Sequence, residues 1–367
     1  MLDARMVRHS GIGTYVRGLL GEYREHPFFY QNALGLALPP SLSSEVNGTG
    51  QVYPFRSSIY SLQEQIEYPF RLRHCRLWHA PHYNVPLLKG NTRLVVTIHD
   101  LIHWIFRKEF YSPLQAAYAN LLIQKALSSA DRIIAVSQKT KDDLVKHLRA
   151  PESKITVIYE GVSPVFFTPS EPQERRRICD KYSLPEKFFL YVGLIKPHKN
   201  IKRLLSVFQK LREAKKIDSH LVLVGKKDRR YSSGFEDLAQ LKTGEGIHYL
   251  ENVESQKELS ALYASAVALV HPSLYEGFGL TILEAMASRT PVIVSNAGSL
   301  PEVAGEAGYF IDPASEDSLA SALQKIEKGE TLRNELVKKG LEQARKFSWQ
   351  KAADQTIEVY KEVLNSK

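Results

Sequence analysis

Two glutamates, Glu276 and Glu284, lie at the two ends of a glycine-containing turn in the stretch EGFGLTILE. A carboxylate accepts hydrogen bonds from hydroxyl groups, so each glutamate can bind a polyhydroxylated ligand. The turn follows an apolar strand-like run and opens a helix-like run, where backbone amides and the helix dipole favour an anion. The pattern therefore predicts an anion held between two hydroxyl-binding carboxylates, by the amides of Gly277, Phe278, Gly279, Leu280 and Thr281.

Basic side chains follow another strand-like run, FFLYVGLI. Lys196, His198 and Lys199 precede a helix that we expect to begin near Asn200. Because the lysine ammonium is a compact positive charge, this cluster is suited to bind a phosphate. The alternative for each residue is an ordinary solvated surface side chain.

The first half of the chain carries two further candidates. His99 and Asp100 follow the run LVVTI, where a histidine can donate a hydrogen bond to a sugar hydroxyl or simply cap the strand end. Gly11 and Gly13 open an amphipathic segment, so this turn can bind an anion or start a helix without any ligand. The spacing to the next glycine does not match the dinucleotide-binding fingerprint.

An alternation of strand-like and helix-like segments must position these groups. Strands are predicted at 94–100, 132–137, 154–162, 188–195, 220–225, 267–273 and 290–295, and helices at 112–127, 138–148, 200–214 and 255–266. This order predicts an α/β fold with parallel sheets covered on both faces. Ligands of such sheets bind beyond the carboxyl ends of the strands, which is where the candidate residues fall.

The length of 367 residues favours two domains. A proline-containing segment, residues 160–177, separates two strand-like runs and is the best linker. We therefore expect an N-terminal Rossmann-like domain at 1–165 and a C-terminal one at 166–346. A helix at 347–367 follows, and the first strand should be very short.

Composition narrows the function classes. The apolar runs are too short to span a membrane and no secretion signal is recognisable, so a cytoplasmic location is expected. Two cysteines, Cys75 and Cys179, support neither a disulfide framework nor a zinc cluster. The net charge is +9, of which residues 1–165 carry +6 with 19 Lys and Arg against 13 Asp and Glu. This half can meet an anionic partner, or its charge can simply be solvated.

The second half combines three recognition elements in one candidate site. A carboxylate can accept both hydroxyls of a ribose, a second carboxylate can accept sugar hydroxyls, and amides with lysine can hold phosphates between them. Together these elements describe a nucleotide-sugar site.

The sequence resembles the retaining GT-B glycosyltransferases of family 4, whose donor signature is a glutamate, seven residues and a second glutamate. The resemblance covers nearly the whole chain, through DARMVRHSGIGTYVRGLL, VVTIHDL, RIIAVSQKTKDDL, VIYEGV, YVGLIKPHKN, HPSLYEGFGLTILEAMASRTPVIVS and GSLPEVAGEAG. It implies two Rossmann-like domains facing across a cleft. The N-terminal domain would take the acceptor and the C-terminal domain the nucleotide-sugar, and the last helix would cross back to the N-terminal domain.

The same resemblance assigns roles to individual residues. Glu284 would bind the donor ribose, Glu276 the transferred sugar and Lys199 the diphosphate. His99 would face the sugar and Gly13 would border the phosphates. His99, Lys199 and Glu276 are thus the expected catalytic residues.

Two positions depart from the family pattern. Leu194 stands where many relatives carry an arginine that contacts the diphosphate, so Lys196, His198 or another basic residue would have to replace it. Glu160 stands in place of the usual asparagine, which leaves its role open.

The resemblance also implies a reaction class. We expect a metal-independent transferase without a cofactor, because lysine and helix-end amides can neutralise a diphosphate. GDP-mannose is the first guess for the donor, with UDP- and ADP-sugars as alternatives. The acceptor would be a saccharide or a lipid-linked saccharide of a surface polysaccharide, with an anionic membrane surface as a further partner on the inner face of the membrane, and no nucleic acid.

Alternatives remain within and outside the enzyme class. An epimerase or phosphorylase would act without a separate acceptor, and a protein that kept the fold without catalysis would only bind the nucleotide-sugar. For a transferase, Asp100 is the one candidate base for inversion that the resemblance does not assign to the donor. No carboxylate nucleophile is offered for double displacement, so we expect retention by front-face attack.

Overall fold

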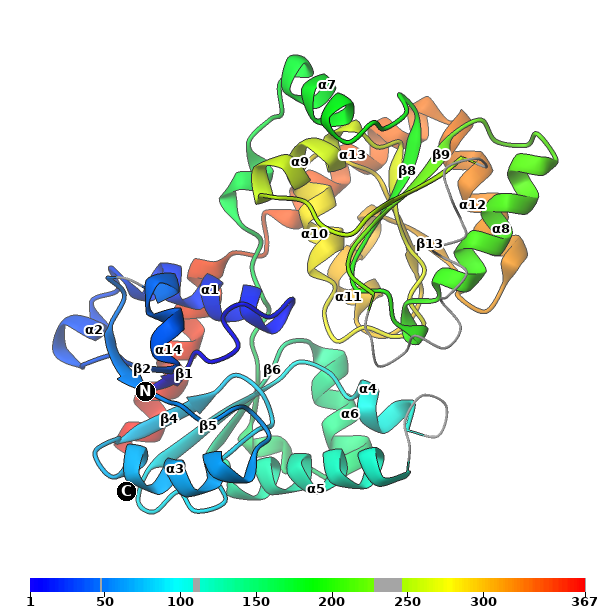
Figure 1. Cartoon of the computed structure of the whole chain (residues 1–367). Helices are drawn as coiled ribbons and strands as arrows, with labels where there is room; N and C mark the ends of the chain where they lie inside the picture. Colours follow the sequence, from blue (N-terminus) through cyan, green and yellow to red (C-terminus); the bar gives the residue numbers. More distant parts are fainter. Residues whose placement is uncertain (47, 108–112, 228–245, 367) are drawn as a thin grey trace. The chain divides into compact units, whose positions relative to one another are not determined.

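The chain folds into two α/β units, each built around one parallel sheet with helices on both faces (Figure 1). The computed structural model describes residues 1–46, 48–107, 113–227 and 246–366. The first unit comprises Met1–Gly161 together with Ser348–Lys367, and the second comprises Val162–Phe347. The predicted α/β class is confirmed.

The first unit contains a seven-stranded sheet in the order β3-β2-β1-β4-β5-β6-β7. Its central strands are apolar and buried on both faces, as expected of a parallel sheet under two helical layers. The order reverses between β1 and β4, so the carboxyl ends of these strands border a crevice of the type that binds ligands. The strands are β1 Leu2–Asp3, β2 Gly35–Leu38, β3 Gln51–Pro54, β4 Leu77–Ala80, β5 Arg93–Ile98, β6 Arg132–Ala135 and β7 Ile155–Val157.

Helices alternate with these strands along the chain. Several begin at a serine whose side chain accepts a hydrogen bond from the first turn, as Ser61 does from the Glu64 amide and Ser137 from the Thr140 amide. The helices are α1 Ile12–Tyr23, α2 Phe28–Gln31, α3 Leu62–Leu72, α4 Ile102–Ile105, α5 Pro113–Ser129 and α6 Gln138–Leu148.

The C-terminal helix α14, Trp349–Asn365, completes the first unit and packs against α1. Its Tyr360 hydroxyl lies 2.5 Å from Nδ1 of His79 and 3.1 Å from the hydroxyl of Tyr23. Burial lowers the pKa of His79 to about 3, so this imidazole stays neutral and takes part as a hydrogen-bonding group. Trp349 at the start of α14 packs edge-on against Tyr15 of α1.

The second unit contains a six-stranded sheet in the order β10-β9-β8-β11-β12-β13. The order reverses between β8 and β11, which pair directly with Leu269 opposite Leu190. The carboxyl ends of β8 and β11 therefore form the switch point at which ligands of such sheets bind. The strands are β8 Phe188–Val192, β9 His220–Val224, β10 Ile247–Leu250, β11 Ala268–His271, β12 Val292–Ser295 and β13 Gly308–Ile311.

Helices cover both faces of this second sheet. Apolar side chains of α8 and α12 fill one layer of the core with those of the strands, including the fully buried Phe189 and Phe208. The helices are α7 Pro172–Lys181, α8 Ile201–Glu213, α9 Gln256–Ser265, α10 Leu280–Ala287, α11 Leu300–Ala304, α12 Glu316–Lys328 and α13 Glu330–Ala344. In the part of the chain that the structure describes, none of the helices is both long and apolar enough to cross a membrane.

Candidate active site

Lys199 and Glu276 meet at the switch point of the second sheet. Lys199 ends the short turn that follows β8, and Glu276 lies in the loop that follows β11. The Nζ atom of Lys199 is 2.5 Å from Oε1 of Glu276, with side chains only 17% and 10% exposed. The fold thus brings together two groups that are 77 residues apart in sequence.

The same oxygen of Glu276 accepts two further hydrogen bonds. Ser273 donates from Oγ over 2.6 Å and His271 from Nε2 over 2.9 Å. Burial alone raises the pKa of a carboxyl group, but the charge of Lys199 and the hydrogen bond from His271 hold the pKa of Glu276 well below its usual range. Glu276 is therefore a fixed, ionised acceptor at neutral pH.

His271 links this carboxylate to the beginning of α10. Its Nδ1 atom lies 3.3 Å from the hydroxyl of Thr281. When Nε2 donates to Glu276, Nδ1 of a neutral imidazole must accept, so the hydroxyl of Thr281 is the donor. The last residue of β11 thus orients both the carboxylate and the first turn of the helix.

The backbone of the loop around Glu276 is fixed by the loop between β12 and α11. The Ser299 amide donates to the carbonyl of Glu276 over 3.1 Å, and the single proton of the Ser299 hydroxyl is shared between that carbonyl, at 3.1 Å, and the carbonyl of Phe278, at 2.8 Å. Gly298 has φ 59°, and a Cβ there would lie 2.7 Å from the nitrogen and the oxygen of Glu276. Only glycine permits this close approach.

The N-terminus of α10 has neither a capping side chain nor an acidic residue in its first turn. The helix begins after Gly279, which has no side chain with which to cap it. Leu280 and Thr281 bring no carboxylate into the first turn, so the positive end of the helix dipole is unopposed there. This turn follows Gly277 and Phe278 directly, and the side chain of Phe278 is buried against Phe347. The predicted anion-binding amides therefore start at a real helix N-terminus.

Glu284 lies on the second turn of α10 and receives a hydrogen bond from the hydroxyl of Tyr263 on α9, 3.0 Å from Oε2. Burial raises the pKa of Glu284 to about 7, and the bond from Tyr263 offsets only part of that effect. The two signature glutamates thus differ in charge at neutral pH: Glu276 is ionised and Glu284 is close to its midpoint.

Leu194 follows Gly193 at the end of β8, and its carbonyl accepts a hydrogen bond from the hydroxyl of Tyr191 over 3.1 Å. Lys199 supplies a positive charge next to the negatively charged carboxylate of Glu276. His198 is buried and also contributes favourably to the ionisation of Glu276. Lys196 and His198 remain proposals as replacements for the family arginine.

His99 lies in the first unit, at the carboxyl end of β5. Its Nδ1 atom is 2.9 Å from Oε1 of Glu160, and its Nε2 atom is 2.9 Å from the carbonyl oxygen of Pro81. A carbonyl oxygen only accepts hydrogen bonds, so Nε2 of His99 carries a proton. The carboxylate of Glu160 next to Nδ1 favours a second proton on that atom, which makes the imidazole positively charged. Burial lowers the pKa of His99, but the hydrogen bond and charge of Glu160 outweigh it and raise the pKa above its usual value. Glu160 thus has a role: it binds the imidazole of His99.

Gly13 lies in the first turn of α1, which begins after Gly11 without a capping side chain. A Cβ at Gly13 would lie 2.6 Å from the carbonyl oxygen of Val7, so glycine lets the helix approach this loop. Asp100 uses Oδ1 to accept from the amide of Ile102 over 2.9 Å. This contact makes Asp100 part of the turn into α4.

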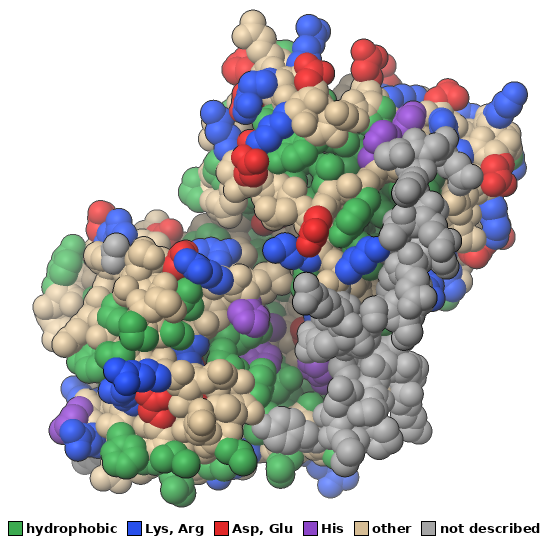
Figure 2. Space-filling model, in the orientation of Figure 1, with side chains coloured by type: hydrophobic (Ala, Val, Ile, Leu, Met, Phe, Trp, Pro, Cys, Tyr) green, Lys and Arg blue, Asp and Glu red, His purple; other side chains and the backbone are tan. Residues whose placement is uncertain are grey.

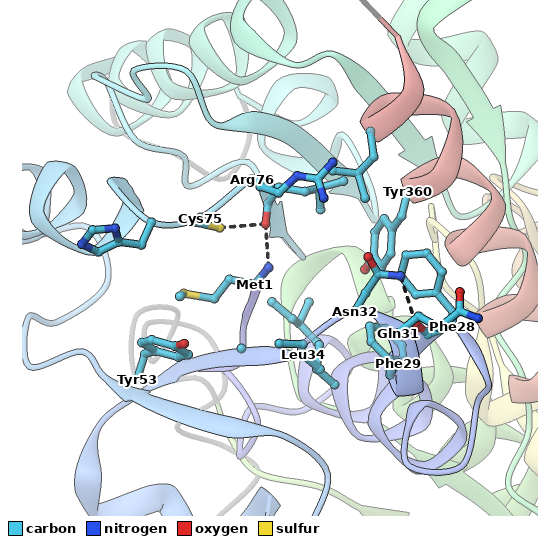
Figure 3. Close-up of a pocket in the computed structure, with 16 residues that line it drawn as sticks. Met1, Phe28, Phe29, Gln31, Asn32, Leu34, Tyr53, Cys75, Arg76 and Tyr360 are labelled. Carbon is cyan, nitrogen blue, oxygen red and sulfur yellow. Dashed lines mark hydrogen bonds between the residues drawn. The ribbon is translucent and has the colours of Figure 1, made fainter.

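A cavity of about 320 Å³ opens at the other end of the first sheet (Figure 3). It lies at the amino ends of β1, β2 and β4, and Phe28, Phe29, Arg76 and Tyr360 are among the residues that line it. In it the amino group of Met1 and the thiol of Cys75 both donate to the carbonyl of Leu77, over 2.6 and 2.8 Å. His99 and Gly13 belong to the carboxyl ends, so this cavity is separate from the predicted site.

Sequence reasoning missed the residues that hold the predicted ones in place. His271 and Ser273 fell inside the predicted strand 267–273, whereas β11 ends at His271, so their place at the strand's carboxyl end was not recognised. Tyr263 left no such signal, because it lies on a helix 21 residues from Glu284. Across the described residues, no group of three or more His, Cys, Asp or Glu side chains is arranged to hold a metal ion.

Two family models match the two units in turn. Residues 13–166 match the model described as Glycosyltransferase Family 4, and residues 175–343 match Glycosyl transferases group 1. The O-antigen chain mannosyltransferase B of Escherichia coli is 34% identical over 293 residues, covering 78% of this chain and 74% of the relative. The chain belongs to the family 4 glycosyltransferases. RfbU, an O-antigen chain mannosyltransferase of Salmonella typhimurium, is 30% identical over 308 residues, with 81% and 78% coverage.

Solved structures agree on the fold of this glycosyltransferase. HepE of Anabaena, solved with UDP-glucose, superimposes with a TM-score of 0.79 at 16% identity, and 98% of each chain is covered. A glycosyltransferase of Rickettsia africae gives a TM-score of 0.74 at 19% identity and covers 100% of this chain and 98% of its own. The expected GT-B class, with two Rossmann-like domains, is confirmed.

Proposed function

We propose that this glycosyltransferase transfers mannose, with retention of configuration, from a nucleotide-sugar to a saccharide or lipid-linked acceptor of a surface polysaccharide. The observation that carries the proposal is the Lys199–Glu276 pair at the switch point of the second sheet, next to the uncapped start of α10. Two relatives named as O-antigen mannosyltransferases support mannose and the polysaccharide. GDP-mannose is accordingly the first donor to test, before UDP- and ADP-sugars.

In the proposed donor complex, positively charged groups bind the diphosphate and carboxylates bind the hydroxyl groups. The α10 amides and Lys199 bind the diphosphate, and Glu284 accepts the ribose hydroxyls. When Lys199 turns to the phosphate, Oε1 of Glu276 loses one donor and can accept a hydroxyl of the transferred sugar. His271 and Ser273 keep the carboxylate in position during this exchange.

The reaction step follows from the same groups. The acceptor oxygen bonds to the anomeric carbon on the face that the leaving group departs from, while the bond from that carbon to the phosphate oxygen breaks. The acceptor proton passes to the leaving phosphate oxygen, and Lys199 and the helix amides stabilise its negative charge. This assignment requires neither a metal nor a protein base, and the predicted contact of His99 with the sugar stays a prediction.

The test is a donor screen followed by product analysis. GDP-mannose at 100 times its Kd should raise the stability of the protein by about 2.7 kcal/mol in a thermal-shift assay. Transfer to a mannose-containing acceptor in EDTA should give an α-linked product, read from the one-bond carbon–proton coupling at the anomeric carbon in its NMR spectrum. An inverted product, or a need for divalent metal, would overturn the mechanism.

The runner-up functions give different outcomes in the same assays. A protein that only binds the nucleotide-sugar would show the thermal shift without consuming the donor. An epimerase would convert the donor to a second nucleotide-sugar without an acceptor.

We further propose that the acceptor is presented at an anionic membrane surface, in keeping with the +6 charge of residues 1–165.

A further inference from the structure

Helix α3 carries a stripe of exposed apolar side chains. Leu62, Ile66 and Phe70 are 87%, 67% and 66% exposed. Their spacing of four residues places them on one side of the helix, whereas Tyr68 and Leu72, on the other side, are buried in the first unit. Three large apolar side chains in a row on the surface of a folded unit indicate an interaction site rather than scattered exposure.

The loop after β4 extends this stripe. Leu87 and Leu88 are 49% and 72% exposed, and the amide of Leu87 donates to Oε1 of Gln65 on α3 over 2.9 Å. Leu88 also shares a hollow of about 650 Å³ with Pro69 of α3. We name the five exposed apolar residues Leu62, Ile66, Phe70, Leu87 and Leu88 the α3 patch. Figure 2 shows hydrophobic side chains along the edge of the first unit where α3 lies.

Basic side chains border the α3 patch. Arg73 and Arg76 are exposed and line the same hollow as Leu88, together with His74. Within the described ranges neither arginine has a carboxylate partner. The acidic group on this side of the helix, Glu67, is bound by Arg71 over 3.1 Å. The surface beside the apolar stripe is therefore positively charged.

We propose that the α3 patch and its two arginines form a docking surface for an anionic lipid bilayer. A bilayer interface fits both features, because apolar side chains enter the boundary between headgroups and acyl chains while guanidinium groups bind lipid phosphates. An uncharged apolar partner would offer Arg73 and Arg76 no anionic group to bind. The biological purpose of this docking surface, the presentation of a lipid-linked acceptor, rests on the proposed function. The binding of the α3 patch to a bilayer is inferred from the surface residues alone.

The experiment is flotation of the full-length protein with vesicles of phosphatidylcholine alone or with 30% phosphatidylglycerol. Wild type should float with the anionic vesicles at low salt and be released at high salt. The double variant Ile66→Ser with Phe70→Ser, and the double variant Arg73→Glu with Arg76→Glu, should each lower the partition coefficient roughly tenfold or more. All four side chains are exposed, so circular dichroism should show an intact fold.

Matched controls lie elsewhere on the first unit. Tyr30→Ser removes a tyrosine of α2 that is 74% exposed, and Lys351→Glu reverses an exposed charge on α14; among the described residues, neither helix contributes to the core layer that holds α3. Neither should change flotation by more than about twofold. Equal losses in the controls and the patch variants, or no wild-type binding to anionic vesicles, would overturn the inference.

Two further readouts separate the inference from its rivals. If the α3 patch binds a second copy of the chain, wild type should sediment as a dimer that Ile66→Ser with Phe70→Ser dissociates, and this result would reject the bilayer. Donor hydrolysis without vesicles should be the same in patch variants and wild type. Vesicle binding without any transferase activity would reject the proposed function and leave the docking surface intact.

Discussion

Glu284 couples a buried carboxyl group to the pH of the solution. Its pKa of about 7 lies above the ordinary value of 4.5, so between these values the folded state holds a proton that the unfolded chain has released. Stability should therefore fall as pH rises from about 4.5 to 7, by at most about 3.5 kcal/mol at 1.4 kcal/mol per pKa unit. The free energy of unfolding, measured by denaturation between pH 4.5 and 7, should fall in wild type but not in Glu284→Gln.

This protonation also concerns the ligand. If Glu284 accepts ribose hydroxyls, donor binding favours the ionised form and should release a proton below pH 7. Calorimetry in two buffers of different ionisation enthalpy measures that proton, and Glu284→Gln should release none. Equal stability slopes in wild type and Glu284→Gln would show that the carboxyl group is not the titrating group.

Lys199 compensates a buried carboxylate and is proposed to stabilise the leaving phosphate. Lys199→Ala should cost about 2 kcal/mol or more in stability, because Glu276 then keeps its charge without its cation. Turnover should fall more than donor affinity, since the phosphate charge grows as the sugar bond breaks. In a double-mutant cycle, Glu276→Gln should recover much of the stability lost in Lys199→Ala, whereas additive losses would contradict the pairing.

Glu160 should govern the protonation of His99. The pKa of His99 is raised in the folded state, so the stabilisation is fully present below about pH 6.5 and is lost as pH rises through the folded value. Glu160→Gln removes the charge and should lower this pKa, which NMR titration of labelled histidine can follow. His248, in the second unit, serves as the reference signal. If the pKa of His99 were the same in Glu160→Gln as in wild type, Glu160 would not be the group that raises it.

At the scale of elements, one glycine controls where the Glu276 loop can lie. Gly298→Ala would place a Cβ 2.7 Å from the backbone of Glu276 at φ 59°, so the loop must move. We expect a loss of about 1–3 kcal/mol in stability and weaker donor binding. The control is Gly21→Ala within α1, where a Cβ meets nothing within 4 Å and alanine should add about 0.5–1 kcal/mol. Equal behaviour of the two variants would disprove the role of Gly298.

The strands β5 to β9, β11 and β12 were predicted because their signals are local, whereas β2, β3, β4, β10 and β13 were not. The run FFLYV predicts a strand buried on both faces, and β8 spans Phe188–Val192. The spacing of apolar residues in NIKRLLSVFQKLREA predicts the amphipathic α8. Strand order and the exposed stripe on α3 were not predictable, since they depend on which faces distant segments cover.

The sequence singled out Glu276 and Lys199, which the structure brings together, but it did not reveal how they contact each other. Glu276 and Lys199 were found by their types and their places after strands. Their direct ion pair was not foreseen, because nothing in a sequence measures the distance between two loops 77 residues apart. The raised pKa of Glu284 was equally hidden, since it arises from burial. Glu160 attracted notice only as a departure from a pattern.

At the scale of the whole molecule, Tyr360 tests how α14 supports the first unit. Tyr360→Phe removes the hydroxyl that binds Nδ1 of the buried His79, and an unpaired buried polar atom costs about 1–3 kcal/mol. Hydrogen exchange should become faster in β4 and α1. The strands of the second unit should keep their protection, and general loosening of both units would contradict this localisation.

The first unit is discontinuous in the chain, since Met1–Gly161 is completed only by Ser348–Lys367. A ribosome must therefore synthesise the entire second unit before α14 emerges, which takes roughly 10–40 s at about 5–20 residues per second. During that interval the buried faces of α1 and β4 that α14 covers stay open to chaperones and to other nascent chains. The unit that starts first is thus the last to finish folding.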